Sequence, residues 1–246
     1  MNINLKDKSI IVTGASSGIG KEIAITLAQI GAQVIMIGRN KCKLDKIVAE
    51  FPNTQYYIYD FNNTAGIEDL ANNIYKMVGK VSGIVYCAGI TDMRPLRLLK
   101  PENLLNVMTV NFLSYIELVR CFTRQGRYLS PMSIIGISSI ASINGSKSKT
   151  AYSASKAAMD SANRCIAVEL AKKDIRINSI QPSWVETDMF YKYTETHGET
   201  DYLKDSLAKQ QMGLISPRDV ANLAIYLLSP LSNKITGEEI KIAGGR

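Results

Sequence analysis

Short apolar runs alternate with helical patterns along almost the whole chain. Strand-forming residues mark the runs at residues 9–12, 34–37, 55–59, 83–86, 132–137, 175–180 and 239–242. Most of these runs are apolar throughout rather than at every second position. A strand that is apolar on both sides belongs to a parallel sheet covered by helices on both faces. The pattern therefore predicts an α/β fold with a doubly wound parallel sheet.

Helical patterns occupy the intervals between the runs, at residues 19–30, 41–51, 66–78, 101–121, 151–171 and 217–228. No repeat, low-complexity stretch or linker interrupts the alternation, so we expect a single Rossmann-type domain over residues 1–246. Residues 189–213 are the exception, because they are polar and dotted with aromatic residues. We expect this insertion to be a lid over a substrate site.

Composition argues against several other classes of protein. Hydrophobic residues make up 46% of the chain and charged residues 21%, as in soluble globular proteins. There is no apolar run of membrane-spanning length and no signal-peptide pattern, so we expect a cytoplasmic protein without membrane contact. Four cysteines without a Cys-x-x-Cys pair, and a single histidine, favour neither a disulfide framework nor a metal site.

The net charge of +7 comes from scattered basic residues without interleaved aromatic residues, so no nucleic-acid partner is expected. The charge is compatible with a solvated basic surface, with an acidic partner or with a polyanionic substrate.

A glycine-rich turn lies between the first predicted strand and the first predicted helix. It reads Thr13-Gly14-Ala15-Ser16-Ser17-Gly18-Ile19-Gly20. Glycines there permit a tight turn and let backbone N–H groups approach a pyrophosphate at the helix N-terminus. Glycines also occur in ordinary strand-to-helix turns, but the flanking elements favour a dinucleotide site. Its expected contacts are Gly14, Ser16, Ser17, Gly18, Ile19 and Gly20.

The segment Gly38-Arg39-Asn40 after the second strand bears on the choice of cofactor. An acidic residue at this place would bind the adenosine ribose hydroxyls of NAD(H). Arg39 can instead bind the 2′-phosphate of NADP(H), and a hydrogen bond to a charged group contributes about 1.5 to 3 kcal/mol. We therefore expect NADP(H) rather than NAD(H); a surface arginine at the start of a basic helix is the alternative.

Tyr152 and Lys156 lie four residues apart in a predicted helix and so share one face. A phenol with a pKa of about 10 is a poor acid or base at neutral pH. A cation about 4 Å away stabilises the phenolate by about 4 kcal/mol, so we expect Lys156 to lower the pKa of Tyr152. Together with Ser139 and the glycine turn, the pair predicts a dinucleotide-dependent redox enzyme, although each side chain alone also fits a helix cap or a surface position.

These motifs resemble the short-chain dehydrogenase/reductase family over nearly the whole chain. They are Thr-Gly-x-x-x-Gly-x-Gly, a serine thirteen residues before Tyr-x-x-x-Lys, and an asparagine in the preceding helical region. The resemblance implies a catalytic set of Asn111, Ser139, Tyr152 and Lys156. In that set Asn111 would hold a water that links Lys156 to solvent.

The same resemblance implies further cofactor contacts. Asp60, Ala88 and Gly89 would form part of the adenosine pocket, and Thr187 would meet the nicotinamide carboxamide. Tyr152 and Lys156 would also contact the cofactor, with Lys156 at the nicotinamide ribose.

Three segments depart from the usual family pattern. Tyr86-Cys87 stands where two asparagines are usual, Ser183 follows Pro182 in place of a glycine, and Ala243 precedes Gly244-Gly245 in place of an aspartate. These departures put the contacts around the adenosine ribose and the nicotinamide in question, but none falls on the catalytic set.

The implied activity is the interconversion of a carbonyl and a secondary alcohol by hydride transfer, with Tyr152 as general acid/base. The chain looks most like 3-oxoacyl-carrier-protein reductases, and four basic residues offer contacts for an acidic carrier protein: Arg124, Arg127, Lys172 and Lys173. A sugar, a steroid or another small alcohol stays open as substrate. A catalytically silent NADP-binding regulatory or interaction protein is the alternative, and the resemblance implies a homotetramer.

The aromatic residues of the expected lid have two interpretations. They line the substrate pocket or simply pack the lid: Trp184, Phe190, Tyr191 and Tyr193.

Overall fold

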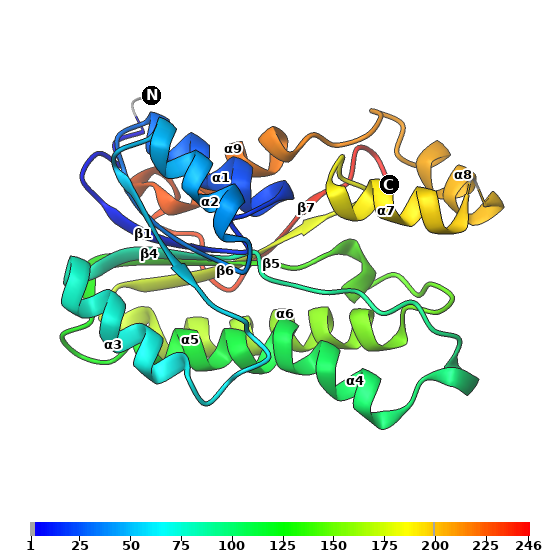
Figure 1. Cartoon of the computed structure of the whole chain (residues 1–246), viewed down its shortest axis with the longest axis horizontal. Coiled ribbons are helices and arrows are strands. Elements are labelled where there is room, and N and C mark those ends of the chain that lie inside the picture. Colours follow the sequence, from blue (N-terminus) through cyan, green and yellow to red (C-terminus); the bar gives the residue numbers. More distant parts are fainter. Residues whose placement is uncertain (1–2, 199) are drawn as a thin grey trace.

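The computed structural model describes residues 3–198 and 200–246 and contains one seven-stranded parallel sheet. The strand order is β3-β2-β1-β4-β5-β6-β7, with the topological switch point between β1 and β4 (Figure 1). The strands are β1 (Ser9–Thr13), β2 (Gln33–Gly38), β3 (Thr54–Ile58), β4 (Val81–Tyr86), β5 (Tyr128–Ile137), β6 (Ile175–Pro182) and β7 (Glu239–Ile242). This topology confirms the predicted doubly wound Rossmann-type fold.

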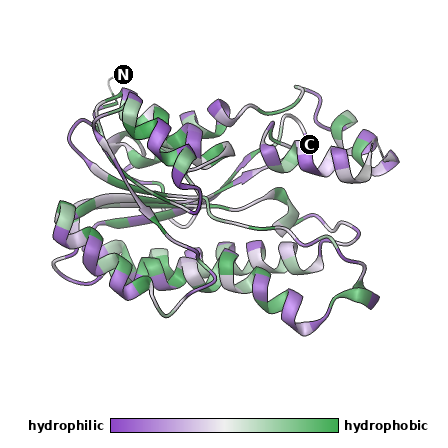
Figure 2. Cartoon of the chain, in the orientation of Figure 1, coloured by the Kyte–Doolittle hydropathy of each residue, from purple (hydrophilic) through white to green (hydrophobic). Residues whose placement is uncertain are grey.

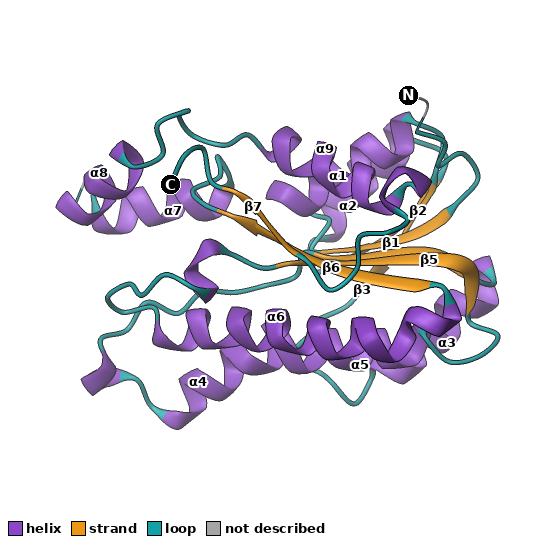
Figure 3. Cartoon of the chain, turned by 180° about the vertical axis from the view of Figure 1, so that it is seen from behind, coloured by secondary structure: helices purple, strands orange, loops and turns teal. Residues whose placement is uncertain are grey.

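Helices cover both faces of the sheet, as Figure 1 and the reverse view in Figure 3 show. One face carries α1 (Gly18–Gln29), α2 (Lys41–Glu50) and α9 (Pro217–Leu228). The other face carries α3 (Ile67–Val78), α4 (Pro101–Met108), α5 (Ser114–Phe122) and α6 (Thr150–Leu170). The expected insertion after β6 forms two further helices, α7 (Asp188–His197) and α8 (Asp201–Ala208).

Alternate side chains of the central strands enter two separate cores. Ile10 and Val12 of β1 pack with Ile23 of α1, whereas Ile11 packs with Ile74 of α3 on the opposite face. The covering helices carry hydrophobic and hydrophilic residues in alternation, as expected when one side of a helix rests on a sheet (Figure 2). Burial on both faces explains why the strand runs are apolar throughout.

The helix predicted over residues 101–121 is interrupted. A π-helical turn at Thr109–Leu113 separates α4 from α5, so the structure corrects the single continuous helix. By length and composition alone the stretch Pro101–Phe122 could cross a membrane, but 44% of its apolar 18-residue window is buried inside the protein. Its buried side packs against α3 and α6, which accounts for the apolar composition.

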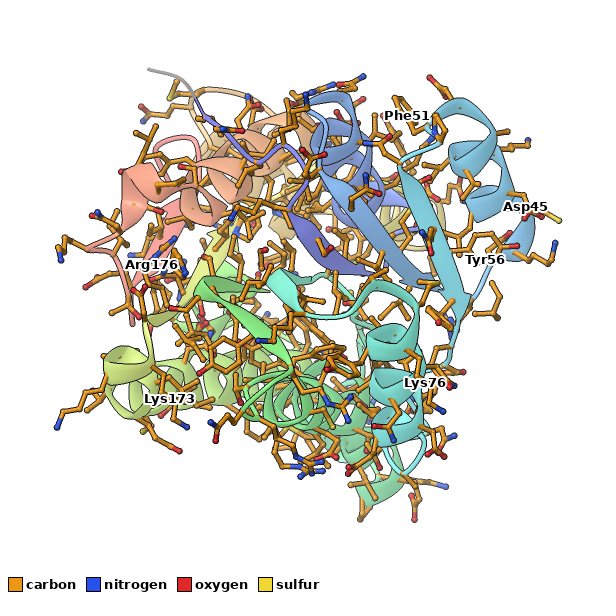
Figure 4. All side chains as sticks on the ribbon, turned by 90° about the vertical axis from the view of Figure 1, so that its left-hand side faces the viewer. Asp45, Phe51, Tyr56, Lys76, Lys173 and Arg176 are labelled. Atoms are coloured by element: carbon orange, nitrogen blue, oxygen red, sulfur yellow. The ribbon has the colours of Figure 1, made fainter. Side chains whose placement is uncertain are left out.

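Arg176 closes the end of the sheet at which the strands begin (Figure 4). Its side chain is buried, and the guanidinium donates hydrogen bonds to the carbonyls of Leu227 at 2.8 Å, Ser229 at 3.2 Å and Ile235 at 3.3 Å. Leu227 and Ser229 lie where α9 ends, so the cation, together with the hydroxyls of Ser133 and Ser232, satisfies carbonyl groups that have no partner within the helix. These hydrogen bonds join the end of α9 to the sheet.

Candidate active site

A cleft opens at the opposite end, beyond the carboxyl ends of the strands, and residues of α7 and α8 line it. Figure 1 shows both helices at that end of the sheet. Doubly wound sheets bind their ligands at this end. The cleft brings together all the predicted site residues except Asn111: Gly14, Ser16, Ser17, Gly18, Ile19, Gly20, Arg39, Asp60, Ala88, Gly89, Ser139, Tyr152, Lys156 and Thr187. Asn111 is fully buried and lies outside the lining of the cleft.

The floor of the cleft is bare backbone at the glycine turn. Gly14 has a φ of +64°, and an added Cβ would lie 3.0 Å from the backbone nitrogen of Ala88. At Gly20 an added Cβ would lie 2.5 Å from the carbonyl oxygen of Gly14. Any larger residue would displace the turn from the sheet, so the close approach of the backbone depends on these glycines.

The N-terminus of α1 is left open toward this floor. Asn40, Thr187 and Ser216 cap α2, α7 and α9 with their side chains, whereas Ser17 makes no side-chain capping bond to α1. The backbone N–H groups of the first turn are therefore available to an anion, and the turn contains no acidic residue to repel one. The glycine floor and the open helix end both fit the pyrophosphate of a dinucleotide.

Ser139 and Tyr152 meet on the far wall of the cleft. Ser139 lies two residues after the end of β5, and its hydroxyl accepts a hydrogen bond from the backbone N–H of Ala141 at 3.1 Å, which fixes its rotamer. Tyr152 lies in the first turn of α6 and forms a hydrogen bond with Ser139. Burial raises the pKa of Tyr152 above its usual value, and the bond to Ser139 opposes that rise.

Lys156 lies behind Tyr152 on the same face of α6. Its side chain is only 4% exposed, and Nζ donates a hydrogen bond of 2.6 Å to the carbonyl oxygen of Ile137. Nζ lies 5.8 Å from the centre of the Tyr152 ring. Burial lowers the pKa of Lys156 to about 8, and the carboxylate of Asp160 opposes this shift.

The expected direct effect of Lys156 on the phenol is corrected by this geometry. The ammonium is directed at the Ile137 carbonyl, and the pKa of Tyr152 is raised by burial rather than lowered by the cation. The group that lowers the pKa of Tyr152 is Ser139, through its hydrogen bond.

Comparison with known proteins decides the family of the chain. A family model described as enoyl-(acyl carrier protein) reductase matches residues 14–246. This chain belongs to the short-chain dehydrogenase/reductase family. An L-xylulose reductase of Caenorhabditis elegans is 33% identical over 99% of this chain and 97% of its own length. A 3-oxoacyl-(acyl-carrier-protein) reductase of Thermotoga maritima is 31% identical over 99% of both chains.

Solved structures of oxidoreductases have the same fold over the same length. A short-chain type dehydrogenase/reductase from Mycobacterium ulcerans matches with a TM-score of 0.88 at 29% identity, covering 99% of this chain and 90% of that one. A variant of actinorhodin polyketide ketoreductase, solved with NADPH, matches with a TM-score of 0.89 at 25% identity, covering 99% and 98%. The protein is thus an oxidoreductase of the short-chain dehydrogenase/reductase family that uses a nicotinamide cofactor.

Cys87, one departure from the family pattern, leaves the backbone of the cofactor pocket intact. The hydroxyl of Thr13 accepts hydrogen bonds from the backbone N–H groups of Cys87 at 3.0 Å and Ala88 at 2.9 Å. This contact ties β1 to the end of β4 without the usual asparagine side chains. Burial raises the pKa of the Cys87 thiol to about 12, so the thiol stays neutral at physiological pH.

Ser183, the second departure, fits its position without strain. Its backbone N–H donates a hydrogen bond of 2.9 Å to the carbonyl of Ile242, and its φ is not in the left-handed region that would require glycine. Its hydroxyl is buried without a partner among the described residues. The added side chain therefore narrows the cleft but does not alter the backbone path of β6.

Arg39 and Asp60 face each other at the adenosine end of the cleft. Arg39 NH1 and Asp60 Oδ2 are 3.9 Å apart, and their side chains are 66% and 52% exposed, so the pair is weak. Ser16 lies next to them, because an added Cβ on Gly38 would be 3.3 Å from its hydroxyl oxygen. A cation and a hydroxyl group thus lie together beside the end of β2, and the nearby carboxylate belongs to the end of β3.

Asn111 supports the cleft from behind. It lies in the π-helical turn, a feature often found at functional sites. Its Oδ1 accepts a hydrogen bond from the backbone N–H of Ile90 at 2.8 Å, and its Nδ2 donates to the Ile90 carbonyl at 3.0 Å and the Ser155 hydroxyl at 2.9 Å. The amide therefore joins the loop after β4 to the residue that precedes Lys156.

Asp160 was missed by the sequence analysis. It lies one helical turn beyond Lys156 and is 3% exposed, and its Oδ2 accepts hydrogen bonds from Ser138 at 2.8 Å and Gln181 at 2.9 Å. Gln181 also donates to Glu239 of β7 at 3.0 Å. The buried carboxylate thus links α6, β5 and β6 around the lysine. The i, i+4 spacing from Lys156 was the available signal.

Aromatic residues form the wall at the other end of the cleft. The Trp184 ring lies 5.8 Å from that of Phe190 and 5.1 Å from that of Tyr193, and all three residues line the cleft. Tyr191 points away, because it is 48% exposed and its hydroxyl bonds to Glu186. Of the two interpretations of these aromatic residues, lining the pocket therefore holds for three of the four, and Tyr191 is the exception.

Three further lining residues were also missed by the sequence analysis: Lys149, Tyr202 and Arg246.

One cluster of potential metal ligands occurs in the described ranges, where α3 and α5 meet. It comprises Glu68, Glu117 and Cys121. Arg120 pairs with both carboxylates and Arg124 pairs with Glu68, so the cluster is already neutralised by two cations. The side chain of His197 lies outside the described part of the chain.

Proposed function

We infer that this protein is an NADP(H)-dependent reductase or dehydrogenase that interconverts a carbonyl and a secondary alcohol. The observation that carries the proposal is the presence of Ser139, Tyr152 and Lys156 in the same cleft as the glycine floor and the open end of α1. A proton donor, an oxygen-binding hydroxyl and a dinucleotide cradle are the parts that such a reaction requires.

The roles of the side chains follow from their positions. The nicotinamide ring supplies the hydride for reduction when the cofactor is bound. Ser139 and Tyr152 bind the carbonyl oxygen from one side, and Tyr152 donates its proton as that oxygen becomes an alkoxide. Ser139 stabilises the phenolate that remains through its hydrogen bond, and Lys156, held by the Ile137 carbonyl, binds the nicotinamide ribose. Asn111 positions the loop after β4 and the start of the proton path to solvent, and Thr187 meets the carboxamide.

NADP(H) is the proposed cofactor because Arg39 and Ser16 lie together where the 2′-phosphate would be held. We expect Arg39→Ala to reduce the preference for NADPH over NADH at least about tenfold, since it removes one charge-assisted hydrogen bond. The ratio of kcat/KM for the two cofactors measures this change, and Lys46→Ala on the exposed side of α2 is a matched control. An unchanged ratio in the Arg39 variant would contradict the assignment.

A 3-oxoacyl thioester, as the name of the Thermotoga maritima relative indicates for that protein, is one substrate that the cleft can be tested with. Carrier-protein docking would use Lys172 and Lys173, which are exposed at the end of α6. Arg124 and Arg127 contribute less, because Arg124 pairs with Glu68 and Arg127 bonds to Asn72.

Three features of the proposal concern the rest of the molecule. Residues 189–213 act as a lid, because Met189, Phe190 and Tyr202 reach the cleft from α7 and α8.

The protein works in the cytoplasm as a homotetramer whose α4–α5 and α6 helices pack across a two-fold axis. Leu105 and Leu113, which are 60% and 42% exposed, would be covered in that contact. Light scattering on the purified protein tests the oligomeric state.

The decisive experiment is a screen of NADPH oxidation with 3-oxoacyl thioesters, diketones and keto sugars. We expect turnover with at least one class, and Tyr152→Phe should lower kcat by about 10²- to 10⁴-fold while NADPH still binds. Tyr191→Phe, a phenol outside the cleft, is the matched control. Turnover that survives in Tyr152→Phe would reject the assigned role. NADPH binding without turnover across the whole panel would favour the silent regulatory protein.

A further inference from the structure

The substrate end of the cleft carries two cations, whereas the two described carboxylate side chains that line the cleft, Asp60 and Asp188, already pair with Arg39 and Lys43. Lys149 immediately precedes α6, and its Nζ lies 4.5 Å above the Trp184 ring and 5.8 Å from the centre of the Tyr202 ring. Arg246 lines the same part of the cleft and forms a hydrogen bond with Tyr202. Among the described residues Lys149 has no ion-pair partner, and its polar contact is a phenol.

Arg246 is brought to this place by a fixed turn. Gly244 and Gly245 have φ values of +57° and +95°, and an added Cβ on Gly244 would lie 2.9 Å from Cγ of Gln210. Gln210 is itself bound to the backbone of Trp184 on both sides, accepting from the N–H at 3.1 Å and donating to the carbonyl at 3.0 Å. The arginine, the tryptophan and the lysine therefore belong to one structural unit.

The two cations disfavour each other where they stand. Burial lowers the pKa of Lys149, Tyr202 opposes the shift, and the charge of Arg246 adds to it. For Tyr202, burial acts to raise the pKa, but hydrogen bonds with Ser146, Ser206 and Arg246 and the charge of Lys149 together lower it. An anion placed between the two cations would remove their repulsion and restore the charged form of the lysine.

The geometry points to a binding site for an anionic oxygen group, carboxylate or phosphate, on the carbonyl substrate itself. Lys149 and Arg246 are the residues that bind this group, and Trp184 stacks against the body of the substrate. This inference rests on the proposed function, because it places the anion in the same cleft as Tyr152. Lys149 lies three residues before Tyr152, immediately before α6, and both residues line the cleft. The anion therefore shares the substrate end of the cleft with the reacting carbonyl, whereas the pyrophosphate site lies at the other end.

Matched substrate pairs test the inference. One pair is 3-oxocyclohexane-1-carboxylate and its methyl ester, and the other is dihydroxyacetone phosphate and dihydroxyacetone. We expect the wild-type protein to use the charged member of at least one pair at least tenfold more efficiently, and the preferred pair identifies a carboxylate or a phosphate. Lys149→Met should lower kcat/KM for that charged member at least tenfold more than for its neutral partner, mainly through KM.

The controls separate loss of charge from loss of structure. Lys147→Met removes an exposed lysine that does not line the cleft and should leave the ratio within a pair unchanged. Lys149→Gln serves if the methionine variant fails to fold. Equal use of both members by the wild-type protein, or an equal loss for both members in the Lys149 variant, would overturn the inference while the proposed function stands.

A binding measurement keeps the inference testable if no member is turned over. Calorimetry on the NADP⁺-saturated protein would use benzoate, phenyl phosphate and neutral benzamide as probes. We expect one of the anions to bind at least tenfold more tightly than benzamide and to lose that advantage in Lys149→Met. This result without turnover would support the anion site and reject the proposed activity. Equal binding of all three probes would overturn the anion site.

Discussion

Lys156 and Arg176 are buried cations at opposite ends of the same sheet, and they are held in different ways. Arg176 is 8% exposed and donates to three main-chain carbonyls where α9 and the following loop end. Lys156 is 4% exposed, and its one hydrogen bond within the described chain goes to Ile137. Burial lowers the pKa of both groups, to about 8 for the lysine.

This difference separates a structural cation from a reactive one. A guanidinium stays charged at any physiological pH, and its planar donors match several carbonyls at once. An ammonium with a pKa near 8 and unused donors responds to whatever binds beside it. At the carboxyl end of the sheet, the buried charge of Lys156 lowers the stability of the folded protein. At the amino end, the charge of Arg176 binds the end of α9 to the sheet.

The largest expected effect on this comparison comes from Arg176→Met. The methionine fills the space but removes the hydrogen bonds from the guanidinium, and the carbonyls of Leu227 and Ser229 keep only those from the hydroxyls of Ser133 and Ser232. We expect the free energy of unfolding to fall by about 3 kcal/mol, since a hydrogen bond from a charged donor contributes about 1.5 to 3 kcal/mol. Urea denaturation measures this loss. A change below about 1 kcal/mol would show that water replaces the guanidinium and that the contact is not structural.

A smaller effect of opposite sign is expected for Lys156→Met. A fall in pKa from 10.5 to about 8 corresponds to about 3 kcal/mol of destabilisation by the buried charge. Loss of the bond to Ile137 returns about 1 kcal/mol, so the cofactor-free variant should be more stable than the wild type by about 2 kcal/mol at pH 7.

The sign of the pH dependence provides a check on Lys156→Met. Well below pH 8 the lysine is protonated in both states, and its full cost is present. Between pH 8 and 10.5 the folded lysine loses its proton before the unfolded one, so the cost fades and the advantage of the variant should disappear. Lys173→Met, at an exposed lysine labelled in Figure 4, should change stability little at any pH. An advantage that persists at pH 10.5 would contradict the buried-charge explanation.

The smallest effect is expected for Asp160→Asn, which keeps the shape and removes the charge. Asp160 raises the pKa of both Lys156 and Tyr152, and it also acts on Tyr115 of α5. Without the carboxylate both active-site pKa values fall, so both limbs of the kcat profile should move to lower pH by about half a unit to one unit. Ser138→Ala removes a hydrogen bond to Asp160 without changing charge and should leave the limbs in place. Limbs that shift equally in both variants would reduce Asp160 to a packing residue.

The fold and most of the cleft were predictable, because both depend on local patterns. The runs of apolar residues reproduce the strand positions, and the glycine turn and the Tyr152-x-x-x-Lys156 spacing place their side chains by helix geometry alone. The π-helical turn at Thr109–Leu113 was not predictable, since a shift in backbone hydrogen bonding leaves no trace in side-chain periodicity. β5 begins at Tyr128, four residues before the predicted start at residue 132. The prediction began the strand after Pro131, because proline is rare inside strands.

The missed residues depend on contacts between distant parts of the chain. Asp160 accepts a hydrogen bond from Gln181 of β6, a partner that the local sequence around Asp160 does not reveal. Arg246 reaches the cleft only because the Gly244-Gly245 turn packs against Gln210. The pKa of Tyr152 also depends on burial by elements far away in the sequence, which is why a pairwise estimate with Lys156 gave the wrong direction.

Trp184 is the only tryptophan in the chain, and it lies between the lid aromatics and Lys149. Its emission therefore reports on one corner of the molecule without any label. Closure of α7 and α8 would shift the wavelength of the tryptophan fluorescence. A reduced nicotinamide nearby would quench this fluorescence by energy transfer. The protein thus contains its own optical sensor for events at the place where a substrate would enter.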